Sequence, residues 1–303
     1  MKDIITLIII VSIVFVIASE FCFRFVVLAK RKTKEKAFKL LKNRYNYNIE
    51  NFKRFNFEDL EIISSDNLKL KAHYINKFND SNKVVIIAHG YTDNYYISAQ
   101  FIDMFLNEQF NVLLIEARSH GNSEGKYATY GYYEKQDLDL WVNLIRDKVG
   151  EDVVIGIQGQ SMGAASALMY AGDNEDKVDF IIADSSYTTA KAYLAFQFHR
   201  LAHIPLFPAY QIINMKVKKR CGFSLEQCNP INSIKDKEIP VLFVHGKKDV
   251  LVPYTMSIEM YDAKIGNKNK LFIVEDAGHI EAYAKDKVGY EKVVNEFIKE
   301  AIN

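Results

Sequence analysis

The 303-residue chain has few of the residues that mark disulfide-rich, disordered or repetitive proteins, with only 3 cysteines, 5 prolines and 14 glycines. Cys22, Cys221 and Cys228 form no C-x-x-C pair, and no histidine lies at zinc-binding spacing from them, so the sequence lacks a zinc or dithiol motif. An odd cysteine count also argues against a disulfide framework. Cys221 and Cys228 are close enough in sequence to pair, but free thiols are the simpler interpretation. The scarcity of proline and glycine, with no repeat and no low-complexity tract, excludes disordered and solenoid classes.

The chain also lacks an excess of charge of either sign. Its 39 Lys and Arg residues nearly balance 38 Asp and Glu residues, for a net charge of +1. Such a balance gives no whole-protein basic field, so we expect no nucleic-acid partner. The length and the 49% hydrophobic content suit one large domain with a substantial core, or two small ones.

The N-terminus, by contrast, is strongly apolar. Ile4 to Ala18 is an almost unbroken run of aliphatic and aromatic residues, and the run continues to Phe23 with Glu20 as an interruption. As a helix, this segment would rise roughly 30 Å, enough to cross the hydrocarbon core of a bilayer. Glu20 and Arg24 are four residues apart, so they could pair or reach the interface. We therefore predict a membrane anchor over residues 1–29.

Two alternatives compete with an uncleaved anchor. A cleaved signal peptide needs small residues at its cleavage site, which the stretch from Val16 to Glu20 supplies poorly, and the bulky Phe21 before Cys22 excludes a lipobox. A buried core helix would not need to be apolar on all faces. Basic residues follow the segment, which predicts a cytoplasmic location for the rest of the chain. These are Lys30, Arg31, Lys32, Lys34 and Lys36.

The remaining sequence alternates between predicted strands and helices. We predict a basic juxtamembrane linker or helix over 30–54 and one α/β domain over 55–303, with a mostly parallel sheet flanked by helices. Predicted strands cover 57–63, 68–75, 84–88, 112–115, 153–157, 180–183, 241–244 and 271–274. Predicted helices cover 97–106, 133–145, 161–170, 256–263 and 288–302.

One stretch, at about 187–234, contains no predicted strand. It is rich in aromatic and aliphatic residues and is interrupted by Pro205 and Pro208. We predict a small helical cap over the sheet. Its apolar side chains could line a substrate pocket or form the core of the cap itself.

The segment G-Q-S-M-G centred on Ser161 lies between a predicted strand and a helix of small residues. A G-x-S-x-G segment in this context typically holds a nucleophilic serine on a sharp turn, where flanking side chains would collide. The match is short, and an ordinary strand-to-helix turn is the alternative. A serine hydroxyl also needs a base and an orienting acid.

Candidates for the base and the acid follow Ser161 in the order acid, then histidine. Asp249 follows the strand at 241–244, and His279 follows the last predicted strand. Asp184 is a rival for the acid, because it ends the strand before the cap, but Asp249 fits the usual chain order better. For His279 the alternative is an ordinary surface-loop histidine.

The oxyanion of an acyl-transfer intermediate needs two preorganised donors. The backbone N–H of Met162 directly follows the serine. The second donor is predicted to be the backbone N–H of Tyr91, because Gly90 before it allows close approach. An ordinary turn with a convenient glycine would also explain this loop.

Together these motifs resemble the α/β-hydrolase superfamily from about residue 55 onward. The motifs are H-G-Y-T-D-N (89–94), R-S-H-G-N-S-E-G (118–125), G-Q-S-M-G, H-G-K-K-D-V-L-V-P (245–253) and A-G-H (277–279). The chain looks most like membrane-anchored hydrolases of Gram-positive bacteria, near the serine aminopeptidase-like branch. The resemblance implies no metal and no organic cofactor. Glu116 and Ser119 depart from the Asp and Gly usual near the second motif, in a loop that is mainly structural.

These features lead us to expect a serine hydrolase of carboxylic esters with Ser161, His279 and Asp249 as a triad. The substrate would be a small acyl ester, and the cap and anchor suggest that it is apolar. A peptidase, an amide hydrolase or an acyltransferase could use the same residues. A non-catalytic ligand-binding relative is the alternative from a different class.

Overall fold

The computed structural model describes residues 1–202 and 206–302, and its eight strands form one sheet. The strands are β1 (Glu58–Ile63), β2 (Lys69–Ile75), β3 (Lys83–Ala88), β4 (Asn111–Glu116), β5 (Val154–Gln160), β6 (Phe180–Asp184), β7 (Val241–Gly246) and β8 (Lys270–Val274). All eight predicted strands are thus confirmed, with ends shifted by a few residues.

The order of the strands in the sheet is β1-β2-β4-β3-β5-β6-β7-β8. β2 pairs antiparallel with both β1 and β4, and every other pair is parallel. The carboxyl ends of β3 to β8 therefore lie at one edge of the sheet. In open α/β sheets this is the edge where binding sites form.

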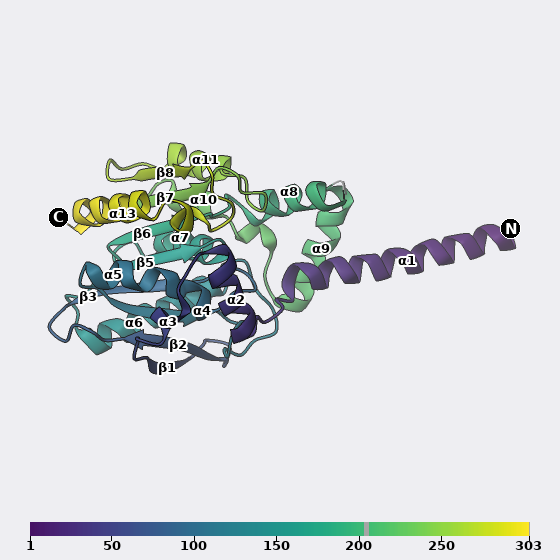
Figure 1. Ribbon diagram of the computed structural model, residues 1–303. Coiled ribbons are helices and arrows are strands. Elements are labelled where there is room, and N and C mark those ends of the chain that lie inside the picture. Colours follow the sequence, from purple (N-terminus) through teal and green to yellow (C-terminus); the bar gives the residue numbers. More distant parts are fainter. Residues whose placement is uncertain (203–205, 303) are drawn as a thin grey trace.

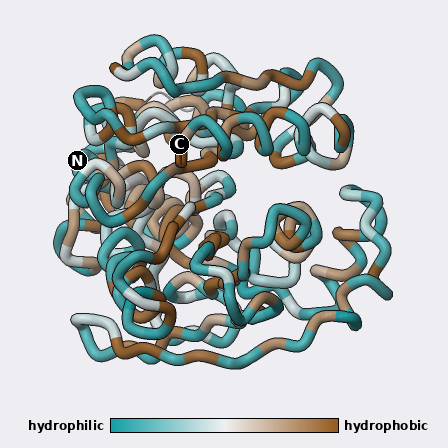
Figure 2. The backbone as a smooth tube through the Cα atoms, turned by 90° about the vertical axis from the view of Figure 1, so that its left-hand side faces the viewer, coloured by the Kyte–Doolittle hydropathy of each residue, from teal (hydrophilic) through white to brown (hydrophobic). Residues whose placement is uncertain are grey.

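Helices cover both faces of the sheet (Figure 1). Outside the cap and the N-terminus they are α4 (Tyr95–Ser98), η1 (Ala99–Phe101), α5 (Ile102–Asn107), α6 (Glu134–Val149), α7 (Met162–Asp173), α11 (Thr255–Ala263), α12 (Ala282–Lys285) and α13 (Lys287–Ile302). In Figure 2, hydrophobic stretches of the tube gather in the interior and hydrophilic residues lie along the outer loops.

Successive residues of a strand point to opposite faces of the sheet, so alternate side chains pack in two separate hydrophobic cores. On β3, Val84 and Ile86 pack in a cluster with residues of α6 and α7. Val85 and Ile87 pack in a second cluster with α5 and α13 on the other face. A sheet buried on both faces explains why these strands are uniformly apolar in sequence.

The prediction of a single helix over 97–106 is wrong in detail. The structure has a short α-helix ending at Ser98, a 3₁₀ turn over Ala99–Phe101 and a second α-helix from Ile102. Both helix types place residues i and i+3 on nearly the same face, so apolar spacing could not separate them.

The segment between β6 and β7 is helical, as predicted for the cap. It contains α8 (Ala190–Ala202), α9 (Leu206–Cys221), η2 (Leu225–Gln227) and α10 (Pro230–Ile234). Within α9, Phe207 has extended backbone angles (φ −94°, ψ 133°), so the regular helix begins at Pro208, where the fixed φ of proline suits a first turn. Pro205 lies outside the described residues.

Three helices precede the sheet: α1 (Lys2–Val27), α2 (Lys34–Arg44) and α3 (Ile49–Phe52). α1 is long and apolar enough to cross a membrane, and it extends away from the body (Figure 1). The predicted pairing of Glu20 with Arg24 is confirmed at 3.0 Å between the guanidinium Nε and the carboxylate. α2 packs on the body through Ala37 and Leu41, which are buried against Ile97 and Ile280.

Candidate active site

Ser161 lies on the turn between β5 and α7, in a backbone conformation that is rare for a side-chain-bearing residue. Its φ is 52° and its ψ is −111°. Such strain persists only where surrounding contacts enforce it, and it is concentrated at functional sites. Here the Ser161 N–H donates to the Asp184 carbonyl at 2.8 Å, and the Ser161 carbonyl accepts from Ala165 N at 3.0 Å.

Two glycines make this turn possible. A Cβ on Gly159 would lie 2.4 Å from the backbone of Ala164, and one on Gly163 would lie 2.1 Å from the Ala88 carbonyl oxygen. Both distances are far below van der Waals contact. The glycines of G-Q-S-M-G are therefore required by the close approach of α7 to β5 and β3.

The loop after β3 lies against this turn. A Cβ on Gly90 would lie 3.4 Å from both the Gln160 carbonyl oxygen and the Ser161 Cβ. The next residue, Tyr91, is thus held beside Ser161, and Met162 is the first residue of α7. Of the two predicted donor residues, Met162 therefore directly follows the serine and Tyr91 directly follows the glycine that lies against it.

Asp249 and His279 are brought together by the loops after β7 and β8. The Asp249 Oδ2 lies 2.6 Å from His279 Nδ1, and the Asp249 side chain is fully buried. Its Oδ1 accepts from the N–H groups of Leu251 and Val252 at 2.7 and 2.9 Å. Burial alone would raise the pKa of Asp249, but hydrogen bonds from His245 and His279 hold it well below its usual range. The carboxylate is therefore ionised at neutral pH.

His245, at the end of β7, is a further partner of Asp249 that the sequence analysis did not assign. Its Nε2 lies 3.1 Å from Asp249 Oδ2 and 3.0 Å from the Val252 carbonyl oxygen. Both partners are acceptors, so Nε2 carries the proton, and Nδ1 accepts from the Ser257 hydroxyl at 2.7 Å. The signal in the sequence was the four-residue spacing of His245 and Asp249 at a strand end.

Asp184, the rival acid, has other partners. Its carboxylate accepts from the hydroxyls of Ser185 and Tyr290 at 2.9 and 3.2 Å. It is completely buried, which raises its pKa to about 6. The geometry thus gives Asp249, not Asp184, the hydrogen bond to His279.

Two hydrogen bonds, one between backbone groups and one to the Ser185 side chain, connect the serine turn to the histidine loop. Ser161 N–H bonds the Asp184 carbonyl, and the hydroxyl of the next residue, Ser185, accepts from Ile280 N at 3.2 Å. Ile280 directly follows His279. Within residues 1–202 and 206–302, no three His, Cys, Asp or Glu side chains are grouped so as to hold a metal ion.

The N-terminal segment also contacts both candidate loops. The Tyr91 hydroxyl donates to the Phe25 carbonyl of α1 at 3.3 Å. Arg44 of α2 donates to the His279 carbonyl at 2.9 Å and to the Glu281 carboxylate at 2.6 Å. Residues outside the sheet thus position both the Tyr91 loop and the His279 loop.

The loop that departs from the family pattern is stabilised from within. The buried Glu116 carboxylate accepts from Asn122 N at 2.7 Å, and its backbone carbonyl accepts from the Ser123 hydroxyl at 2.6 Å. Gly121 has φ 49°, and a Cβ there would lie 2.1 Å from the Glu116 carboxylate. Glu116 therefore fixes the turn.

Comparisons with known proteins agree with this architecture. The family described as Serine aminopeptidase, S33, matches residues 79–222. The uncharacterized protein YqkD of Bacillus subtilis is 34% identical, with 90% of this chain and 89% of that protein aligned. An uncharacterized membrane protein of Saccharomyces cerevisiae is 25% identical over 80% of each chain.

Comparison with solved structures also finds similarity to hydrolases. The esterase Pf2001 of Pyrococcus furiosus superposes with a TM-score of 0.69 and 26% identity, over 91% of this chain and 100% of that one. An acylaminoacyl peptidase of Pyrococcus horikoshii, at 18% identity and a TM-score of 0.59, shows the fold alone, over 84% of this chain and 44% of that one. With the strand order, the strained serine turn and the extent of the YqkD match, these likenesses show that the chain belongs to the α/β-hydrolase superfamily.

Proposed function

We propose that this hydrolase cleaves carboxylic esters through an acyl-enzyme formed on Ser161. The observation that carries the proposal is the 2.6 Å contact between Asp249 Oδ2 and His279 Nδ1. The His279 loop is connected to the strained Ser161 turn through Asp184 and Ser185. The contact with Asp249 fixes the proton on Nδ1 of His279 and leaves Nε2 as the ring atom that accepts the serine proton.

In this proposal, a specific residue performs each step of ester hydrolysis. The Ser161 Oγ attacks the ester carbonyl while His279 removes its proton, and the N–H groups of Tyr91 and Met162 stabilise the oxyanion. His279 returns the proton to the leaving alcohol. A water molecule, deprotonated by His279, hydrolyses the acyl-enzyme and restores Ser161. Asp249 is ionised and accepts hydrogen bonds from four donors. It stabilises the His279 imidazolium that forms during both acylation and deacylation.

Substitution of the nucleophile tests this proposal. Ser161→Ala should reduce hydrolysis of short p-nitrophenyl esters by about 10⁴-fold or more and abolish labelling by a fluorophosphonate probe. Ser166→Ala is the matched control, because Ser166 is a buried serine one turn further along α7 whose hydroxyl bonds the Met162 carbonyl. A wild-type chain that does not label, or a Ser161→Ala variant that does, would refute the assignment.

Amide hydrolysis is the second candidate, because the matching family is described as a serine aminopeptidase. The same triad residues would serve it. Parallel assays with aminoacyl p-nitroanilides and p-nitrophenyl esters of matched acyl groups distinguish the two. We expect kcat/KM to favour the ester, and a clear preference for the anilide would assign the chain to the peptidases.

A further inference from the structure

The carboxyl end of α1 is packed into the cap. Phe23, Val26 and Val27 are buried in one cluster with Tyr210, Val217 and other residues of the cap. Backbone carbonyls of α1 also accept hydrogen bonds from the body, from the Tyr130 hydroxyl to Val26 at 2.8 Å and from Ala128 N to Val27 at 2.9 Å. The apolar helix therefore leaves the body in a fixed direction.

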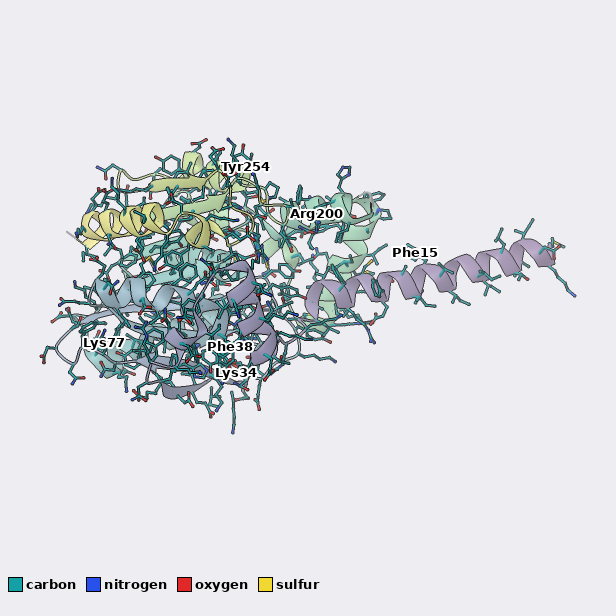
Figure 3. All side chains as sticks on the ribbon, viewed as in Figure 1. Phe15, Lys34, Phe38, Lys77, Arg200 and Tyr254 are labelled. Atoms are coloured by element: carbon teal, nitrogen blue, oxygen red, sulfur yellow. The ribbon has the colours of Figure 1, made fainter. Side chains whose placement is uncertain are left out.

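Charged groups mark the level at which α1 leaves the cap. Glu20 is surrounded by Arg24 of α1 and by Lys216 and Arg220 of α9, at 3.0, 3.4 and 2.8 Å. Toward the N-terminus from this group, α1 is apolar and exposed, and Phe15 lies clear of the body in Figure 3. Three cations around one carboxylate leave a positive surplus where a helix would meet the headgroup layer.

The outer end of the cap exposes large apolar side chains beside this level. Leu201 near the end of α8 and Phe207 near the start of α9 are 54% and 73% exposed, and Met215, further along α9 and next to Lys216, is 62% exposed. The joined ends of α8 and α9 reach out from the body on the side from which α1 leaves (Figure 1), and Arg200 marks this end in Figure 3. Other strongly exposed apolar residues of the body lie on separate elements, for example Ile63 on β1 and Val288 on α13.

Aromatic residues connect the cap with Tyr91 in the loop after β3. Tyr193 of α8 lies 6.2 Å from Tyr130, and Tyr130 lies 6.1 Å from Tyr91, measured between ring centroids. Tyr187 stacks on Tyr193 at 5.4 Å. This tyrosine cluster forms a largely apolar connection between α8 of the cap and Tyr91, which directly follows Gly90.

We propose that the cap end formed by Leu201, Phe207 and Met215 enters the interfacial layer of the bilayer that α1 crosses, and that the substrate is a long-chain ester held in that bilayer. A lipid surface is the expected occupant because the exposed apolar residues of the cap adjoin an apolar helix, with basic residues at the boundary. The substrate class rests on the proposed ester hydrolysis, whereas the membrane contact of the cap does not.

Tryptophan quenching tests the contact directly. The full chain, reconstituted in vesicles of phosphatidylcholine and phosphatidylglycerol with bromine near the ester end of the acyl chains, carries Phe207→Trp or, as control, Val288→Trp. These positions are 73% and 79% exposed, and the native Trp141 is only 1% exposed in the core. We expect quenching for position 207 alone. If bromine quenches position 207 no more than position 288, the proposal is overturned, and the cap end lies in water or against another protein.

Kinetics test the substrate class. A Leu201→Ser, Phe207→Ser double variant should raise KM for a vesicle-borne long-chain ester about tenfold or more, because two apolar side chains lose their burial in lipid. Its kcat/KM for a short water-soluble ester should equal that of the wild type. Ile63→Ser with Val288→Ser is the matched control. Equal loss on both esters, or no loss on either, contradicts the inference. A wild-type chain that hydrolyses neither ester instead refutes the proposed function, and the quenching result still decides the membrane contact.

Discussion

At the scale of single residues, His245 belongs to the candidate site together with the triad residues that the sequence motifs indicated. It is completely buried and donates from Nε2 to Asp249, while Ser257 fixes its other nitrogen. Asp249 Oδ2 therefore receives two imidazole N–H groups, one from His279 and one from His245. We interpret His245 as a positioning residue that sets the orientation of the carboxylate.

Substitution of His245 should lower kcat more than stability alone explains. A hydrogen bond to a charged group contributes about 1.5–3 kcal/mol, which corresponds to roughly a 10- to 100-fold loss in kcat for His245→Leu. His245→Gln, which keeps a donor, should restore part of the rate, and KM should change little. Thermal unfolding of both variants provides the control. If the two variants are equally slow and equally destabilised, the role of His245 is only structural.

The buried Asp184 leads to a prediction of pH dependence. Its pKa is raised by burial to about 6, whereas an aspartate in an unfolded chain has a pKa of about 3.9. Between these values the folded state binds a proton that the unfolded state has lost. This group therefore lowers the free energy of unfolding as the pH rises from about 4 to about 6, by on the order of 2 kcal/mol.

Asp184→Asn should remove that dependence and keep the activity. Denaturant unfolding at about pH 4 and pH 7 should show a smaller pH difference for the variant than for the wild type. Asp249→Asn, by contrast, should lose most of the hydrolysis, because it removes the anionic partner of His279. Inactivity of Asp184→Asn with full activity of Asp249→Asn would reverse the assignment of the acid.

At the scale of elements, α2 contributes more than its sequence indicates. Its lysines made residues 30–54 resemble a solvated linker, yet Ala37 and Leu41 are fully buried, and Arg44 holds the His279 loop. Amphipathic spacing over three turns was present in the sequence. What it could not show was the surface that receives the buried face, because Ile97 and Ile280 are distant in the chain.

Leu41→Ala should accordingly destabilise the fold by about 2–5 kcal/mol, as for other fully buried leucines. Lys39→Ala, on the exposed side of the same helix, should change the stability by no more than about 0.5 kcal/mol. Thermal or chemical unfolding in detergent measures both. A negligible effect of Leu41→Ala would mean that α2 is not docked in solution.

The strands were predictable for a physical reason. A parallel sheet covered on both faces must consist of short apolar runs, and β3 to β8 are such runs. Less predictable were the last residues of β5, where Gln158 and Gln160 are polar yet buried, and the 3₁₀ turn after Ser98. For the candidate site, the chain order indicated Ser161, Asp249 and His279. The contacts of Arg44 with the His279 loop depend on tertiary packing and carry no local pattern, whereas His245 had only its four-residue spacing from Asp249 as a signal.

At the scale of the whole molecule, the distribution of charge predicts the membrane side. Lys30, Arg31 and Lys34 follow α1, and the cap adds basic residues around Glu20. Short basic segments are retained in the cytoplasm, so we expect the hydrolase body to face it. Protease added to intact cells should leave the body whole, and disrupted cells should allow its digestion. Cleavage in intact cells would place the body outside.

The packing of Phe23, Val26 and Val27 into the cap has a kinetic consequence. With α1 as the proposed membrane anchor, a body joined to it by a docked helix end would not swing freely, and Ser161 would stay at nearly constant height above the lipid. For an ester that resides in the same leaflet, enzyme and substrate then meet by lateral diffusion. Turnover should follow the mole fraction of ester in the surface, and diluting it with inert lipid should slow the reaction even when the total amount of ester is unchanged.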